Sequence, residues 1–377
     1  MLSALNRIDL CLGDGVEVVK LSSLGCPEAA KKFVYELSPD STIYHQQAYI
    51  DAQRKINGFA EIIVIMKSGS PMVAMPLHKW GSTGYTTGYS GILLPKKTEE
   101  KYLKKSLDLL IDFFKANKRS CFRVCQSAQS EGGLDSGRQQ LIASLIASKH
   151  NVNGNVFTRI IDFKKHMEHC EDISNLEGLG KHTLLNSYQG KIRNQIKHAI
   201  KNELNVVSII PVTSEEAKRI YTDIYPVYLE SKKRTGMSAQ SLEMLIAYSN
   251  AVRSGGGKDL LVLIKCGESI VSVVNCHIYK SHALYWMNCS TPEAQRLNAN
   301  PLALHASIIE SLNLGAKFFE IGRIDFETSR GVNKEIAIWK YKDQFGGELR
   351  NVLSFDILPT RYKTLNNMKQ LVKRIIT

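Results

Sequence analysis

The chain has 377 residues, 44% of them hydrophobic and 8% aromatic, and its 49 basic and 36 acidic side chains give a formal net charge of +13. This length usually corresponds to about two domains, and the composition is that of a folded protein. The basic excess indicates a partner or substrate with negative charge, such as nucleic acid, anionic lipid or a phosphorylated metabolite. It is spread along the chain, because residues 1–165 contain 22 basic and 15 acidic residues and the remainder contains 27 and 21. A disordered basic arm is therefore disfavoured.

The first residues do not read as a secretory signal, because Arg7, Asp9 and Asp14 interrupt the apolar run that such a signal needs. No later apolar run approaches the roughly 18 residues that cross a bilayer. We therefore expect a cytoplasmic protein with no integral membrane segment, for which association with a membrane surface remains open. The eight cysteines form no C-x-x-C pair, and the stretch HMEHC at residues 166–170 has no second ligand pair nearby, so we expect no metal site.

The first half of the chain begins its regular structure with a hairpin. Two β-branched and apolar runs within residues 60–80 flank a Ser-Gly-Ser-Pro turn, which is typical of two antiparallel strands. Helical spacing of leucines then alternates with short apolar runs. These patterns predict a helix over 99–117, a strand over 120–126, a helix over 137–149 and a strand over 155–163.

The second half repeats this order. A three-stranded antiparallel meander is predicted over residues 259–290, followed by a helix over 300–315, a strand over 317–322, a helix over 333–345 and a strand over 348–356. Corresponding strands lie about two hundred residues apart, which indicates a duplicated fold. The predicted fold class is mixed α/β, with two tandem domains, 1–165 and 166–377, each a mostly antiparallel sheet flanked by helices.

A basic segment, SYQGKIRNQIKHAIKNELNV, starts at Ser187. It is predicted as an amphipathic helix over 187–203, because an apolar stripe lies beside a stripe of Arg193, Lys197 and Lys201 at i, i+4 and i+8. Such a helix packs on a core, so it is no free tether. Its basic stripe is either a phosphate-binding surface or a solvated face.

Three stretches together resemble one family. They are the basic segment, the stretch from Tyr285 to Arg323, and WKYKDQFGGEL at residues 339–349. A meander followed by helix, strand, helix and strand resembles the GNAT acyltransferase fold. Two copies in one chain, with these motifs in this order, resemble the Fem family of peptidoglycan-bridge aminoacyltransferases and the related FemAB-like and BioF2-like acyltransferases. Glu320 stands where that family usually has aspartate, and Tyr341 stands where it usually has phenylalanine.

The resemblance implies a catalytic role for Lys342, which would reach the reacting acyl group or its phosphate-bearing carrier. Tyr341 would shape the wall of the site. Glu320 is a candidate for accepting the proton of the acceptor, and Asp325 is a lesser candidate for the same role. Arg323 could bind a phosphate or carboxylate. The alternatives are that Lys342 is an ordinary exposed helix lysine and that Arg323 only pairs with an acidic residue in the following loop.

Further candidates concern substrate binding. Lys191, Arg193 and Lys197 would bind a diphosphate on the acceptor. Trp286 and Asn300 are added to this set because they lie in the family-like stretch. His305 is a weaker candidate, because a histidine on an apolar helix is more often a packing residue.

The acyl donor is open between aminoacyl-tRNA and acyl-CoA, and no permanently bound cofactor is expected. Single-domain GNAT enzymes bind the pyrophosphate of acyl-CoA with a glycine-containing loop before the helix. Here the corresponding loop, QRLNAN at residues 295–300, has no glycine, which makes acetyl-CoA a doubtful donor.

The leading functional hypothesis is an acyltransferase of cell-envelope or polysaccharide biosynthesis. It would move an acyl or aminoacyl group onto an amine or hydroxyl of a nucleotide- or lipid-linked sugar or of a peptidoglycan precursor. The alternative is a nucleic-acid-binding module, for instance one that binds tRNA without catalysis. Only Tyr188 accompanies the basic residues of the predicted helix, so a platform for stacking bases is not evident in the sequence.

Overall fold

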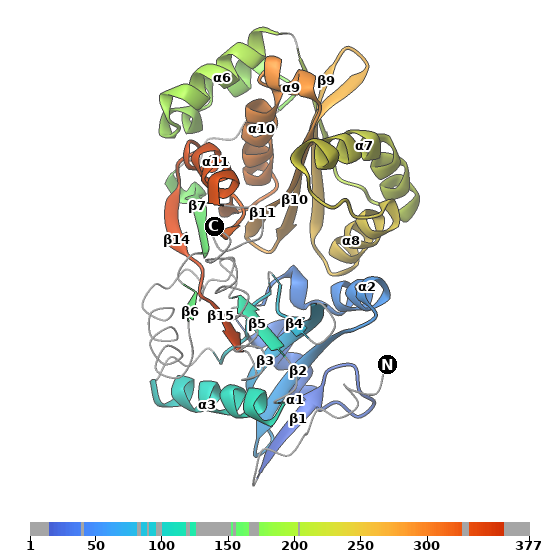
Figure 1. The fold of residues 1–377 in the computed structure, drawn as a ribbon, viewed down its shortest axis with the longest axis vertical. Helices are drawn as coiled ribbons and strands as arrows, with labels where there is room; N and C mark the ends of the chain where they lie inside the picture. Colours follow the sequence, from blue (N-terminus) through green and yellow to red (C-terminus); the bar gives the residue numbers. More distant parts are fainter. Residues whose placement is uncertain are drawn as a thin grey trace, which may run out of the picture. The chain divides into compact units, whose positions relative to one another are not determined.

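The computed structural model describes residues 15–38, 41–80, 84–88, 90–95, 100–117, 121–125, 152–153, 156–165, 173–202, 204–325 and 332–357. The chain divides into two compact units, which we describe separately (Figure 1). Unit 1 comprises residues 1–154 and 352–377, and unit 2 comprises residues 155–351. The predicted helix over 137–149 and the stretch HMEHC lie outside the described residues.

Unit 1 contains a seven-stranded sheet in the order β1-β2-β3-β4-β5-β15-β6. Its neighbours pair antiparallel except β4 and β5, which pair parallel. The strands are β1 (Val16–Lys20), β2 (Ala60–Lys67), β3 (Ser70–Trp80), β4 (Gly84–Thr86), β5 (Cys121–Cys125), β6 (Val152–Asn153) and β15 (Ser354–Ile357). The helices are α1 (Glu28–Lys32), the π-helical η1 (Phe33–Leu37), the 3-10 turn η2 (Ile43–His45), α2 (Gln47–Asn57) and α3 (Glu100–Ala116).

Unit 2 contains an eight-stranded sheet in the order β13-β7-β12-β11-β10-β9-β8, with β14 also paired to β7. Its one parallel pair among the described strands is β11 with β12. The strands are β7 (Val156–Asp162), β8 (Asn205–Ile209), β9 (Lys258–Cys266), β10 (Ser269–Tyr279), β11 (His282–Ser290), β12 (Phe318–Glu320), β13 (Ile324–Asp325) and β14 (Glu348–Asn351). The helical segments are η3 (Phe163–Lys165), α5 (Leu176–Lys181), η4 (Thr183–Ser187), α6 (Gly190–Lys201), α7 (Ser214–Thr235), α8 (Leu242–Ser254), α9 (Pro292–Arg296), α10 (Ala299–Asn313) and α11 (Val332–Asp343).

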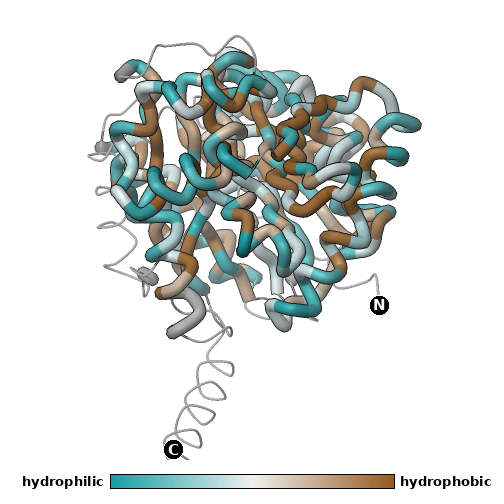
Figure 2. Tube along the Cα trace, turned by 90° about the horizontal axis from the view of Figure 1, so that it is seen from above, coloured by the Kyte–Doolittle hydropathy of each residue, from teal (hydrophilic) through white to brown (hydrophobic). Residues whose placement is uncertain are grey.

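Helices cover both faces of the unit 2 sheet. Figure 1 shows α10 on one side of β10 and β11 and the pair α7 and α8 on the other. The α10 face is packed with the buried residues of α6 and α10 and with alternate residues of β9 to β12, whereas the other face packs against α7 and α8. Hydrophobic and hydrophilic stretches alternate along the helices in Figure 2, as expected for helices that bury one stripe on a sheet.

The two sheets share an internal order, which confirms the predicted fold class. In each, two antiparallel steps are followed by a parallel step, along β2-β3-β4-β5 in one and β9-β10-β11-β12 in the other. The register also corresponds. His78 on β3 lies opposite Ala60 on β2 and Thr86 on β4. His277 on β10 lies in the same way opposite Asp259 on β9 and Leu284 on β11.

The compact units differ from the predicted division between residues 165 and 166. Strand β7, expected at the end of the first domain, pairs with β12, β13 and β14 in unit 2. The predicted strand over 348–356 is two strands, because β14 pairs with β7 whereas β15 pairs with β5 and β6 in unit 1. Val352 and Leu353 between them are buried. Each sheet therefore contains a strand from the half of the sequence expected to form the other domain.

Candidate functional site

The candidate site lies in unit 2, where the parallel pairing of β11 with β12 ends. The pairing covers three residue pairs and stops at Leu284 opposite Glu320. Beyond Glu320 the chain leaves β11 but stays bonded to β7, because the Ile321 N–H donates to the carbonyl oxygen of Arg159 at 3.0 Å. The end of a sheet strand commonly presents functional side chains, since the backbone there is released from the ladder.

Lys342, on the last turn of α11, reaches this strand end. It is buried, its Nζ donates to the carbonyl oxygen of Arg323 at 3.4 Å, and it lies 5.4 Å from the centroid of the Tyr285 ring. Gly322 makes the approach possible. A Cβ at this residue would lie 3.0 Å from the Tyr285 carbonyl oxygen and 3.1 Å from Lys342 Nζ, and its φ of +70° is itself unfavourable for other residues. Lys340, two residues earlier on the same helix, is exposed, so burial distinguishes Lys342 from its neighbour.

Glu320 and Arg323 form a buried pair beside Lys342. Their side chains are 2% and 8% exposed, and Arg323 Nε lies 3.7 Å from Glu320 Oε1. The sequence alternatives placed the partner of Arg323 in the following loop, whereas the structure places it on β12. The Arg323 guanidinium therefore faces a carboxylate of its own chain rather than open solvent, which does not favour its predicted role in binding a phosphate. The side chain of Asp325 lies outside the described residues.

The end of α11 is fixed by a polar cluster centred on Asp343. Arg159 on β7 donates to Asp343 Oδ1 through Nε at 2.8 Å and through a second guanidinium nitrogen. Gln189 Nε2 donates to Asp343 Oδ2 at 3.1 Å, and the Gln189 N–H donates to the Gln344 carbonyl at 2.9 Å. Charge-assisted bonds of this kind are stronger than neutral ones. They hold the turn that carries Lys342 and join it to the start of α6.

The basic helix is shorter than predicted, since α6 begins at Gly190 rather than near residue 187. The preceding residues form the 3-10 turn η4, and Gln189 is held by α11 instead of capping with its side chain. Lys191 and Lys197 are exposed and Arg193 is half-buried, while the apolar stripe of α6 is buried as predicted.

His305 and Asn300 are occupied by contacts within the protein. The Tyr188 hydroxyl lies 3.2 Å from His305 Nδ1, and His305 Nε2 lies 3.0 Å from the Leu179 carbonyl, so Nε2 carries the proton that it donates there. Burial lowers the pKa of His305 to about 4. His305 is thus a core residue, which corrects its prediction as a substrate contact. Asn300 bonds to Ser272 and Ser290 through both ends of its amide and so ties α10 to the strands.

Tyr341 and Trp286 lie on opposite faces of the sheet. Tyr341 packs on Phe345 with ring centroids 5.4 Å apart, and burial raises the pKa of its hydroxyl well above the usual value. Trp286 is half-buried on the face covered by α7 and α8. Its ring stacks on His277 at 4.6 Å and meets Tyr248 edge-on at 5.6 Å.

The sequence reasoning missed several residues around the site. Tyr285 is the ring beneath Lys342, and a buried polar group of Asp259, His277 and Tyr221 lies on the α7 and α8 face. The sequence does contain a sign of Asp259 and His277. Both are polar residues within apolar strands, at positions where the alternation of side chains predicts a buried residue.

The turn before α10 contains a residue, Asn298, in the left-handed backbone conformation that glycine usually adopts. Asn298 has φ +54° and ψ +31°, a left-handed conformation that asparagine tolerates better than most residues. The absence of glycine from QRLNAN therefore does not prevent the turn, and the sequence argument against acyl-CoA loses this support.

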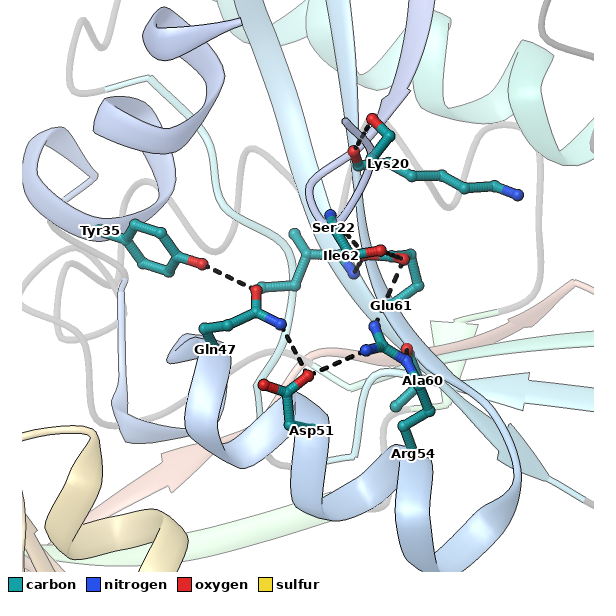
Figure 3. Close-up of polar contacts among 10 residues, drawn as sticks. Lys20, Ser22, Tyr35, Gln47, Asp51, Arg54, Ala60, Glu61 and Ile62 are labelled. Atoms are coloured by element: carbon teal, nitrogen blue, oxygen red, sulfur yellow. Dashed lines mark hydrogen bonds and ion pairs between the residues drawn. The ribbon is translucent and has the colours of Figure 1, made fainter. Parts of the chain in front are cut away.

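A second polar network lies in unit 1 (Figure 3). The buried Glu61 accepts from the Ser22 N–H at 3.2 Å and from the Ser22 hydroxyl, and it lies 3.5 Å from Arg54 NH2. Arg54 also donates to Asp51 at 2.9 Å and to the Ala60 carbonyl at 3.0 Å. These contacts anchor α2 to β2, and we assign the network to structure rather than to ligand binding.

Comparison with known proteins identifies the fold of the chain. No family model and no curated protein matches the chain. Among solved structures, FemX is similar with a TM-score of 0.61 and 14% identity, over 92% of this chain and 99% of that chain. The C-terminal domain of a putative lysylphosphatidylglycerol synthetase from Agrobacterium fabrum gives 0.53 and 11%, over 92% and 95%. A conserved protein of unknown function from Bacteroides thetaiotaomicron VPI-5482 gives 0.51 and 10%, over 88% and 93%. The chain thus shares the fold of FemX, as its resemblance to the Fem family implied.

Within the part of the chain that the structure describes, no helix is both long enough and apolar enough to cross a bilayer.

Proposed function

We propose that the protein is an acyltransferase that moves an acyl or aminoacyl group onto an amine or hydroxyl of a cell-envelope precursor. The observation that carries the proposal is the buried Lys342 at the end of the β11 and β12 pair, in a chain with the fold of FemX. The second similar structure, a domain of a putative lysylphosphatidylglycerol synthetase, favours an aminoacyl rather than a simple acyl group. Aminoacyl-tRNA is the favoured donor and acyl-CoA the alternative.

Acyl transfer requires the protein to stabilise negative charge on the donor carbonyl and to remove a proton from the nucleophile. When the acceptor nitrogen or oxygen attacks the donor carbonyl carbon, negative charge builds on the carbonyl oxygen, and the Lys342 ammonium would donate a hydrogen bond to it. The nucleophile must lose its proton, and the Glu320 carboxylate would accept it directly or through a water molecule. The carrier then leaves with the electron pair of the broken bond. Arg323 holds Glu320 in place in this scheme.

The basic face of α6 would bind the acceptor. Lys191 and Lys197 are exposed and Arg193 is half-buried on a helix whose start is bonded to the end of α11. Cell-envelope precursors are carried on nucleotide or lipid diphosphates, so these three side chains are proposed to bind the diphosphate. This assignment accounts for part of the net positive charge of the chain.

The test is transfer of a radiolabelled group by the purified protein. Charged tRNAs and acyl-CoAs would be offered in turn as donors, with nucleotide-linked sugars and peptidoglycan precursors as acceptors. With the productive pair, Lys342→Ala is expected to lower kcat by about 100-fold or more, because a charge-stabilising donor is removed. Lys340→Ala, on the same helix and exposed, is the matched control and is expected to retain full activity.

Two results would contradict the proposal. The first is full transfer by a Lys342→Ala, Arg193→Ala double variant. The second is absence of any transfer together with tRNA binding whose affinity falls steeply with salt, which would favour the alternative of a nucleic-acid-binding module. The observation that favours this alternative is the exposure of the α6 lysines, which could bind the phosphates of a nucleic acid.

A further inference from the structure

Trp286 occupies the extra position of a β-bulge. Asn275 on β10 pairs with Met287, and the next residue, Cys276, pairs with Tyr285, so Trp286 has no partner across the strand. Bulges of this kind redirect a side chain and are frequent beside functional sites. Here the bulge keeps the indole half-buried on the face of α7 and α8, two residues beyond the end of the β11 and β12 pairing.

The sheet places Trp286 near Glu320. Residues directly opposite across adjacent strands share a face, so Asp259, His277, Leu284 and Glu320 form one row across β9, β10, β11 and β12. Trp286 follows Leu284 by two residues on the same face, which makes it a diagonal neighbour of Glu320. Diagonal neighbours lie roughly 7–8 Å apart, within reach of an aromatic side chain.

A buried polar group fixes the indole from behind. The His277 ring stacks on Trp286 with an interplanar angle of 22°, and His277 Nε2 lies 3.6 Å from Asp259 Oδ1. Asp259 in turn accepts from the Tyr221 hydroxyl at 2.9 Å and from Asn275 Nδ2 at 2.7 Å. These two hydrogen bonds hold the Asp259 carboxylate in one arrangement, and the His277 ring lies between that carboxylate and the indole. The acyl-transfer scheme makes no use of this polar group.

The charges of the site select the kind of group that Trp286 would meet. On the face of Trp286, Glu320 is paired with Arg323, and Asp259 accepts hydrogen bonds from Tyr221 and Asn275. A charged ligand is therefore not required there, whereas a neutral ring with an apolar face can stack on an indole. A ring that also bears hydroxyl groups could donate to Glu320 and accept from Arg323.

We propose that Trp286 is the stacking platform for a neutral sugar ring of the acceptor, and that His277 and Asp259 are positioning residues that hold the indole. The sugar class rests on the proposed acyltransferase function, while the platform itself rests on the bulge, the stack and the row across the sheet. His277 does not touch the sugar in this arrangement. It acts through the orientation of Trp286.

Binding is tested without a donor, so that it does not depend on catalysis. In a variant carrying Trp80→Phe and Trp339→Phe, the remaining tryptophan fluorescence reports on Trp286. Titration with methyl N-acetyl-β-D-glucosaminide is expected to change the emission saturably at millimolar concentrations, and adenosine is not. A saturable response to adenosine instead, or to neither compound, would overturn the proposal. If the double variant folds poorly, calorimetric titration of the wild type and of Trp286→Leu with the same glycoside tests the proposal instead. Binding is expected to the wild type and not to Trp286→Leu.

The positioning role is tested at His277. His277→Leu removes the stacking ring and is expected to weaken glycoside binding by about tenfold, whereas His277→Phe keeps an aromatic ring beneath the indole and is expected to bind within a few-fold of the wild type. In the transfer assay, His277→Leu should raise KM for the sugar acceptor more than it lowers kcat. Equal loss in both variants, at unchanged melting temperature, would show that stacking does not position Trp286.

The two proposals fail separately. Glycoside binding at Trp286 without any acyl transfer would contradict the proposed function and keep the platform. Transfer to a sugar acceptor that is unaffected by Trp286→Leu would do the reverse.

Discussion

Two consecutive glycines after α11 fit where no other residue would. Gly346 and Gly347 both have positive φ, and a Cβ on them would lie 2.9 Å from the Ser187 carbonyl oxygen and 2.8 Å from the Ile160 carbonyl oxygen. Contacts this short with backbone atoms cannot be relieved by moving a side chain. The pair therefore lets β14 turn beside β7 while the end of α11 stays close to the start of α6.

Gly347→Ala tests this explanation against Gly256→Ala. Both residues have φ +81°, but the space beside Gly256 is open. Gly256→Ala is expected to cost about 1 kcal/mol of unfolding free energy from the backbone alone. Gly347→Ala should cost about 1–3 kcal/mol more, since overpacking is added. Urea denaturation of the two variants measures the difference, and equal losses would show that the contact with Ile160 is unimportant.

His305 predicts a pH dependence of stability. Folding lowers the pKa of this group to about 4, mainly through burial, from an unfolded value of about 6.5. The neutral form thus contributes stability that is complete above pH 6.5 and is lost as the pH falls towards 4. The loss from one such group is on the order of 3 kcal/mol when complete.

His305→Gln keeps a donor and an acceptor but does not titrate. It is expected to be less stable at pH 7 and to lose less of its remaining stability than the wild type between pH 6.5 and 4.5, as measured by urea denaturation. Burial also lowers the pKa of His78, His277 and His282 to about 4, so the wild type should be sensitive to acid as a whole. A constant difference between wild type and variant at every pH would contradict this account of His305.

At the scale of elements, α11 and α6 are connected through one carboxylate. Asp343 accepts from Arg159 on β7 and from Gln189 before α6, and the two arginine bonds span 184 residues of sequence. This connection explains why a half-buried acidic residue follows directly on Lys342. It also fixes the start of the basic helix without a side-chain cap.

Asp343→Ala is expected to lower the unfolding free energy by about 1–3 kcal/mol, because charged donors lose their partner. Glu348→Ala is the control, since its pair with Arg350 is largely exposed on the Glu348 side and should contribute less than about 1 kcal/mol. Thermal melting of both variants gives the comparison. A loss as small for Asp343→Ala as for the control would mean that the α11 connection is not stabilising.

Periodicity was sufficient to predict the hairpin, the meander, the helix α10 and the strand β5, but no prediction was made for the helices α2, α7 and α8. It could not predict which sheet each strand joins, because pairing depends on contacts between residues far apart in sequence. The prediction for residues 348–356 illustrates this, as its two ends pair with β7 and β5. For the candidate site, the motif pointed to Lys342, but its burial, its ring partner Tyr285 and the stack of His277 on Trp286 could be seen only in the fold.

At the scale of the whole molecule, the exchange of strands determines which fragments can fold. Unit 2 is a continuous segment, residues 155–351, whereas unit 1 is completed by residues 352–377. The fragment 155–351 is expected to unfold cooperatively on its own. The fragment 166–351 lacks β7, which pairs with β12, β13 and β14, and should not fold. Circular dichroism and melting of both fragments test this, and a folded 166–351 would contradict it.

The same exchange sets an order of events during synthesis. As the chain leaves the ribosome, β5 emerges long before β15, and all of unit 2 must be made in between. The nascent first sheet therefore keeps an open edge at β5, which is a site for wrong pairing with other chains. Unit 2 can close as soon as β14 has emerged, so the unit encoded first is the one finished last.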